Sequence, residues 1–164
     1  MFKVDEKVVN SNGITCVIDR IERMRIPYSK VRKDYYIMHD LVHTGDVFYV
    51  PTDNETSMRY PMTTDEARSL IKSIDDIDKL KIPVERFRDE EYRKCIKECS
   101  PERLVSMLKF FVERKNKRMS LGKSLSSLDE KYMRLASKNL FCELAFSLSL
   151  PVDEVENMII AKIQ

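Results

Sequence analysis

Apolar and β-branched positions in the first part of the chain come in short runs that are separated by turn-forming residues. The runs cover residues 7–9, 14–21, 35–38 and 47–50, and the last one stops at Pro51. Short runs of this kind are typical of β-strands. We therefore predict that residues 1–62 form a small, strongly bent antiparallel β barrel. Gly13 and Gly45 fall in its predicted turns, where a positive φ is often required.

From residue 63 onward the apolar positions follow the period of an α-helix. Capping signals mark helix starts, because Thr63 stands three residues before Glu66 and Ser100 precedes Pro101. We predict helices that open near residues 63, 83, 101, 127 and 151, the second ending near 98 and the third near 122. The fourth has the widest apolar face, which is typical of a buried central helix. Residues 63–164 are thus predicted to be an all-α helical domain, and the chain a two-module α+β protein.

The net charge says little about partners, because 29 Lys and Arg nearly cancel 27 Asp and Glu. No apolar run approaches the roughly 18–20 residues that span a bilayer, and the first residues lack the apolar core of a signal peptide. We therefore expect a cytoplasmic protein without a membrane partner. The four cysteines fit this placement as free thiols.

The sequence lacks the motifs of common catalytic sites. Three glycines cannot build a phosphate-binding loop, and two histidines near each other leave no plausible Ser/His/Asp set. Cys95 and Cys99, like His39 and His43, stand four residues apart, but the His pair falls in a strand-and-loop region where that spacing has no helical meaning. We expect no enzyme activity, catalytic residue, metal site, cofactor or small-molecule substrate.

Positive charge gathers in two stretches, residues 20–33 and 109–123, and each has six basic side chains against one acidic side chain. Either could meet nucleic-acid phosphates or could be a solvated surface. For the first stretch we favour solvent or a protein partner, because Asp34, Asp40 and Asp46 follow it closely. The second stretch leaves both interpretations open.

Segments 100–104, 111–115, 122–126, 129–132, 135–136 and 142–146 form a specific pattern, and segments 2–4, 7–9, 17–22, 35–37 and 50–51 add a looser one. Together they resemble, in order, the CarD/CdnL family of bacterial RNA polymerase-binding transcription regulators. The resemblance implies a Tudor-like β module that binds the RNA polymerase β subunit. It also implies a helical domain that binds promoter DNA at the upstream edge of the melted bubble and modulates the stability of the open complex.

The resemblance assigns candidate residues to both contacts. Those for the polymerase lie on or beside two strand positions at which family members often carry arginine. Those for DNA are the segment that matches the family's wedge region and the basic residues of the later helices. The polymerase-binding candidates are Arg23, Met24, Arg25 and Tyr49, and the DNA-binding candidates are Arg86, Phe87, Arg88, Lys115, Arg118, Lys123 and Lys131.

The chain departs from the family pattern where family members insert a tryptophan into the minor groove, since it has no Trp. Phe87 is the only aromatic residue in the corresponding segment 83–88; the alternative is that it lies on a buried helix face with Glu91 and Cys95. The usual turn sequence of the family is also replaced by a different one at residues 10–14. Two rival hypotheses remain, a polymerase-binding adaptor without DNA contact and a free-standing helical DNA-binding protein.

Overall fold

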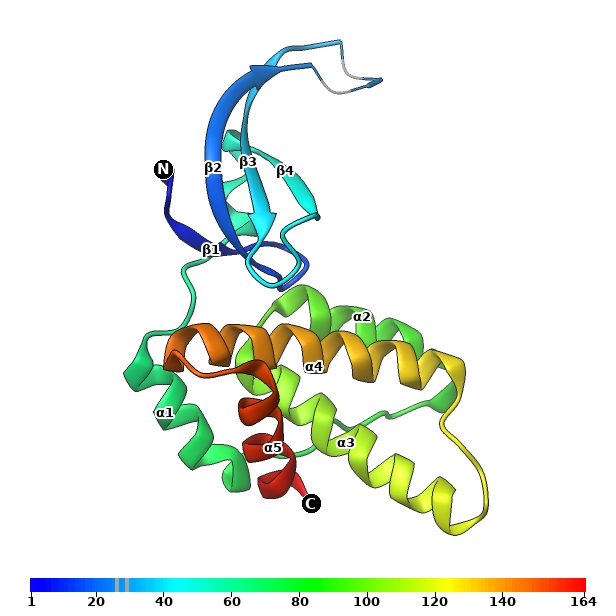
Figure 1. The fold of residues 1–164 in the computed structure, drawn as a ribbon. Coiled ribbons are helices and arrows are strands. Elements are labelled where there is room, and N and C mark those ends of the chain that lie inside the picture. Colours follow the sequence, from blue (N-terminus) through cyan, green and yellow to red (C-terminus); the bar gives the residue numbers. More distant parts are fainter. Residues whose placement is uncertain (26, 29) are drawn as a thin grey trace. The chain divides into compact units, whose positions relative to one another are not determined.

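The structure is a computed structural model that describes residues 1–25, 27–28 and 30–164 (Figure 1). It divides into two compact units, Met1–Pro61 and Met62–Gln164, which we call the sheet unit and the helical unit. The first is built on a β-sheet and the second from helices, so the chain is α+β as its sequence predicts. The division falls one residue before the predicted boundary between residues 62 and 63.

The sheet unit contains four antiparallel strands in the order β1-β2-β3-β4. The strands are β1 (Lys7–Val9), β2 (Thr15–Met24), β3 (Lys33–Asp40) and β4 (Val47–Pro51). Between β1 and β2, the Asn10 side chain accepts the backbone N–H groups of Asn12 and Ile14 at 2.9 and 3.1 Å, and Gly13 has a φ of 75°. This turn agrees with the prediction. Gly45 is not among the residues with positive φ, so the similar expectation for it was wrong.

The sheet is not closed into the predicted barrel, since β1 and β4 do not pair within the described residues. β4 ends at Pro51, which has no N–H to continue a ladder. The polar segment that follows forms the 3-10 helix η1 (Thr52–Ser57) in place of a further strand. Among the described residues outside the named strands, a single bridge, between Val9 and Arg59, brings the chain back to β1. Sequence periodicity predicted the strands but not this missing closure.

One face of the sheet carries the core of this unit. Alternate residues of the strands point to that face because the side-chain period of a strand is two. A bulge between Ile18 and Arg20 shifts the register of β2 against β3, and bulges increase the local twist of a sheet. The buried cluster consists of Val8, Cys16, Ile18, Tyr36, Met38, Val50 and Met58.

The helical unit contains five α-helices, α1 (Thr64–Ser73), α2 (Arg88–Glu98), α3 (Pro101–Ser120), α4 (Ser127–Leu148) and α5 (Val152–Ile163), and the short 3-10 helices η2 (Ile74–Asp76) and η3 (Glu85–Phe87). Thr63 and Glu66 form the predicted capping box at the start of α1. The Ser126 side chain caps α4 by accepting the Asp129 N–H. α4 packs against α1, α3 and α5 and buries residues along its whole length, as predicted for a central helix (Figure 1).

The predicted helix 83–98 begins later than expected. Val84 is extended, with φ −134° and ψ 113°, η3 follows it, and the α-helix opens only at Arg88. A β-branched residue favours extended backbone, and the Glu85 side chain is held by ion pairs with Arg88 and Arg114. The segment before α2 is therefore a tight turn rather than the first turns of a helix.

Candidate functional site

Met24 and Tyr49, two of the polymerase-binding candidates, lie on the same face of the sheet, opposite the core. In the pairing register, Arg20 faces Ile37 and Ile37 faces Tyr49, while Met24 faces Lys33 four residues further along the two strands. Directly paired residues share a face, and residues two apart on a strand share it too. Arg23 lies on the other face, and Arg25 follows the end of β2. The structure thus brings two of the four candidates to one surface.

On this outer face, buried side chains lie beside exposed apolar side chains. Tyr35 and Ile37 are buried, whereas Val47 and Tyr49 on the edge strand β4 are 47% and 51% exposed. His39, on the same face, pairs through Nδ1 with Asp19 Oδ1 at 2.7 Å. We call the half-buried Met24 and the exposed Val47 and Tyr49 the docking face, because accessible apolar side chains on a sheet are a typical protein-binding feature.

In the helical unit, a buried carboxylate organises the segment that contains Arg86, Phe87 and Arg88. Asp129 is fully buried in the first turn of α4, and its oxygens accept from Arg114 Nε and the Tyr92 hydroxyl, both at 2.9 Å. Arg88 Nε lies 3.5 Å from the same carboxylate. Arg114 and Arg88 also pair with Glu85. Two arginines therefore tie the turn before α2 to α3 and α4.

The electrostatics of this cluster favour its charged form. Burial by itself would raise the pKa of Asp129, but hydrogen bonding by Ser126 and Tyr92 and the Arg114 guanidinium lower it below its ordinary value. Burial, together with the hydrogen bond to Asp129, raises the pKa of Tyr92. The hydrogen bond to Glu85 raises the pKa of Arg114. The cluster is a structural ion network. The sequence predicted only a helix that opens near residue 127, and it did not indicate the pairing between Asp129 and Arg114.

Phe87 is exposed, not buried on a helix face. It precedes α2 and is 42% exposed, whereas Cys95 is buried. The Arg86 guanidinium carbon lies 4.5 Å from the centroid of its ring, within the range of a cation–π contact. The alternative that Phe87 shares a buried face with Cys95 was therefore wrong. An aromatic ring and a cation stand together at the surface of a fixed turn.

The second basic stretch, residues 109–123, is partly neutralised by its own unit. Lys109 donates to the Ile77 carbonyl at 2.7 Å, Arg118 to the Ser124 carbonyl, and Lys117 pairs with Glu113 at 2.6 Å. Hydrogen bonds from Lys117 and Lys79 lower the pKa of Glu113 to about 2.

Lys115, Lys123 and Lys131 are the candidates with the most freedom to meet a partner. All three are exposed, and none forms an ion pair with another described residue. Lys131 Nζ lies 5.4 Å from the centroid of the Tyr132 ring. By contrast, Arg88 is committed to Asp129 and Glu85, so its charge is already matched inside the unit.

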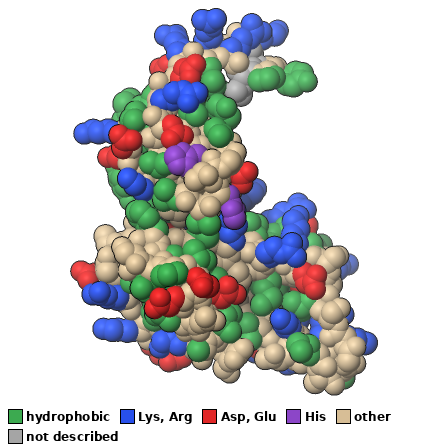
Figure 2. Space-filling model, in the orientation of Figure 1, with side chains coloured by type: hydrophobic (Ala, Val, Ile, Leu, Met, Phe, Trp, Pro, Cys, Tyr) green, Lys and Arg blue, Asp and Glu red, His purple; other side chains and the backbone are tan. Residues whose placement is uncertain are grey.

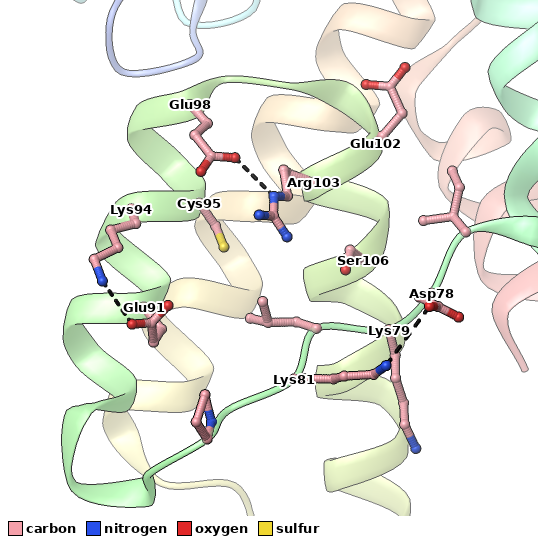
Figure 3. Close-up of a pocket in the computed structure, with 13 residues that line it drawn as sticks. Asp78, Lys79, Lys81, Glu91, Lys94, Cys95, Glu98, Glu102, Arg103 and Ser106 are labelled. Carbon is pink, nitrogen blue, oxygen red and sulfur yellow. Dashed lines mark hydrogen bonds and ion pairs between the residues drawn. The ribbon is translucent and has the colours of Figure 1, made fainter.

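A surface pocket of about 480 Å³ lies between residues 77–83, α2 and the start of α3 (Figure 3). Four acidic and four basic side chains line it. Many of them pair with each other, for example Lys94 with Glu91 at 2.8 Å and Arg103 with Glu98 at 2.9 Å. Burial raises the pKa of the Cys95 thiol, which also lines the pocket. The balanced charge does not favour an anionic or a cationic ligand.

No protein-family model and no curated protein matches this chain. Within the part of the chain that the structure describes, no helix has the length and apolar character needed to cross a membrane. The described residues also contain no group of three or more His, Cys, Asp or Glu side chains that could hold a metal ion.

Proposed function

We propose that this chain is a bacterial transcription regulator that binds the RNA polymerase β subunit with its sheet unit and promoter DNA with its helical unit. The proposal rests on the resemblance to the CarD/CdnL family. The observation that carries it furthest is the exposed Phe87, with Arg86 over its ring, on a turn held by buried ion pairs. In this proposal the bent sheet belongs to a Tudor-like module, and the protein acts in the cytoplasm without catalysing a reaction.

The helical unit would act by binding melted promoter DNA more tightly than closed DNA. An apolar side chain inserted at a base step favours an opened step, and Phe87 is the exposed aromatic residue of its turn. Arg86 beside it and Lys115, Lys123 and Lys131 would meet backbone phosphates. Because a ligand shifts an equilibrium only by its differential affinity, a tenfold preference for the open state stabilises that state by about 1.4 kcal/mol.

The sheet unit would bind polymerase through the docking face. Tyrosine is enriched among the residues that dominate protein interfaces, and Tyr49 is half exposed over the buried Ile37. Met24 supplies adaptable apolar surface on the same face. Arg23 and Arg25 flank Met24 in the sequence. The core of the sheet unit lies on the opposite face, so substitution of Tyr49 leaves that core intact.

Tyr49→Ala is expected to weaken binding of the full-length protein to cognate core polymerase by about 30-fold, the typical loss of an interface residue worth about 2 kcal/mol. Tyr60→Ala is the matched control, because Tyr60 is similarly exposed but lies outside the docking face. Biolayer interferometry on immobilised polymerase measures both. Equal affinities for wild type and Tyr49→Ala would remove the docking face from the proposal.

Lys115→Glu/Lys123→Glu is expected to shorten the open-complex lifetime on a promoter by about 10-fold or more, because two phosphate contacts become repulsive. We avoid Arg118 in this variant because its side chain holds the Ser124 carbonyl. Arg68→Glu/Lys72→Glu on α1 makes the same charge change at exposed positions. Lifetimes are measured by competitor challenge with saturating protein.

The same experiment separates the main proposal from the adaptor without DNA contact. Four of the basic side chains near the candidate DNA surface, Arg88, Arg114, Lys117 and Arg118, are already engaged within the helical unit, which favours the adaptor. If Lys115→Glu/Lys123→Glu binds polymerase normally and leaves the lifetime equal to that of the α1 control, the DNA contact is wrong and the adaptor is retained.

A further inference from the structure

The β2–β3 hairpin extends beyond the rest of the sheet. β1 pairs with β2 only at Thr15–Val17, and β4 pairs with β3 only from Tyr35 to His39. From the paired residues Arg23 and Asp34 outward, the hairpin is therefore two-stranded (Figure 1). We call its described residues, 23–25, 27–28 and 30–34, the arm. An isolated pair of strands has little stability by itself, so such an arm can adapt its twist to a partner.

The arm is strongly basic. Its described residues include five cations and one acid, and Figure 2 shows Lys and Arg side chains gathered at this end of the sheet unit. Lys33, at the base, pairs with Asp53 at 2.7 Å, and that hydrogen bond raises the pKa of Lys33. Arg23, Lys30 and Arg32 form no ion pair with any described residue. Lys30 and Arg32 therefore add positive charge near the tip that no described side chain neutralises by an ion pair.

The acids that follow this stretch in the sequence do not neutralise the arm. Asp40 and Asp46 are joined by a backbone hydrogen bond from the Asp40 N–H to the Asp46 carbonyl. They lie at the opposite end of β3, which at about 3.3 Å per residue places Asp40 roughly 20 Å from Lys33 along the strand. Only Asp34 lies within the arm, facing Arg23 across the strands. These acids therefore do not disfavour a nucleic-acid contact at the arm.

The tip presents apolar side chains to solvent. Tyr28 is fully exposed and Val31 is 60% exposed, and neither belongs to a core cluster of the described residues. Tyr28 also has a φ of 70°, a conformation that L-residues rarely adopt outside turns. The tip thus places a large aromatic ring, away from both core clusters, next to Pro27 and close to Lys30 in the chain.

We propose that the arm binds double-stranded DNA, with Lys30 and Arg32 on phosphates and Tyr28 against the groove. A two-stranded ribbon fits the roughly 12 Å wide major groove of B-DNA, and apolar side chains at the tip of a DNA-binding element can wedge between base steps. This contact goes beyond the proposed function, because its contact residues Tyr28, Lys30 and Arg32 belong neither to the docking face nor to the helical unit.

The composition of the arm favours DNA over an acidic protein surface or an RNA duplex. Lysine is depleted in protein–protein interfaces, whereas protein–DNA interfaces are rich in positive charge. The deep, narrow major groove of A-form RNA does not admit such an element. With five cations and one acid, the arm has the charge balance of a phosphate-binding ribbon.

Fluorescence anisotropy with the full chain and a labelled 30-bp duplex, without polymerase, tests the proposal. Lys30→Glu/Arg32→Glu is expected to weaken binding by about 10- to 100-fold and to reduce the slope of log K against log salt by about 2, one unit per lost phosphate contact. Tyr28→Ala is expected to weaken binding with an unchanged slope. Lys3→Glu/Lys7→Glu, the same charge change at exposed positions of the same unit, is the control.

Two results would overturn the proposal. One is wild-type duplex affinity in Lys30→Glu/Arg32→Glu, or a loss no larger than that of the Lys3→Glu/Lys7→Glu control. The other is binding to poly-glutamate that is as tight as binding to the duplex and equally sensitive to the arm variant, which would assign the arm to an acidic protein. Because polymerase is absent from this assay, its outcome is independent of the polymerase contact tested through Tyr49.

Discussion

Asp129→Ala is expected to destabilise the helical unit by about 3–5 kcal/mol, the usual cost of removing one partner from a buried ion pair. The carboxylate is fully buried and accepts from both Arg114 and Tyr92 at 2.9 Å. Its loss leaves the partly buried Arg114 guanidinium with only Glu85 as an ionic partner. The loss of this carboxylate also removes the contact between Arg88 and Asp129, which joins the turn with Phe87 to α4. Urea denaturation followed by circular dichroism measures the free energy of unfolding.

Two companion variants make this result specific. Glu130→Ala changes an exposed carboxylate in the same turn of α4 and is expected to stay within about 0.5 kcal/mol of wild type. Asp129→Asn keeps the shape of the side chain but removes its charge, so its cost is expected to lie between those of the two alanine variants. A cost for Asp129→Ala as small as that for Glu130→Ala would contradict the role of the network.

The network also predicts that the stability of the protein depends on pH in the acidic range. The folded pKa of Asp129 lies below its ordinary value of 3.8. A carboxylate with a depressed folded pKa contributes stability that is fully present above its unfolded pKa and is lost as the pH falls through the folded pKa. The wild-type protein should therefore lose stability below about pH 4. Asp129→Asn should lose less over the same range.

Local signals predicted most of the secondary structure. Thr63 and Glu66 satisfy backbone N–H groups within one helical turn, so four residues contain the whole signal. The Asn10–Gly13 turn is equally local, because the Asn10 side chain bonds the two N–H groups that follow it. Features of this kind can be read from a sequence without any knowledge of the fold.

The wrong predictions involve features that depend on distant residues. Barrel closure required a strand after Pro51, but this segment formed η1 and returned to β1 only at Arg59. The start of the helix at 83 failed because Glu85 pairs with Arg114, 29 residues away. Periodicity cannot report such pairings.

The same difference between local signals and long-range pairings holds for the candidate site. Sequence reasoning identified the basic stretch 109–123, but it treated Arg118 like the exposed Lys115, although Arg118 donates to the Ser124 carbonyl. It left the exposure of Phe87 open, because that depends on where the following helix begins. The placement of Met24 and Tyr49 on one face depends on the register of three strands. Charge can be counted in a sequence, but its availability to a partner depends on the fold.

Phe111→Ala is expected to cost the helical unit about 3–5 kcal/mol, because it removes a fully buried ring and leaves a cavity. The centroid of the Phe111 ring lies 5.0 Å from the centroid of the Tyr92 ring and 5.5 Å from that of the Phe110 ring. Phe111→Leu retains most of the volume and is expected to cost less than about 1.5 kcal/mol. Equal losses in the two variants would mean that the ring does not fill the core as its burial indicates.

Tyr92 links this aromatic cluster to the ion network, since its ring packs on Phe111 and its hydroxyl donates to Asp129. A cavity beside Tyr92 would let its ring move and would lengthen that hydrogen bond. Phe111→Ala combined with Asp129→Ala is therefore expected to cost less than the sum of the single variants, by about 0.5–3 kcal/mol. Strict additivity in the urea measurements would mean that the core and the turn that carries Phe87 are stabilised independently.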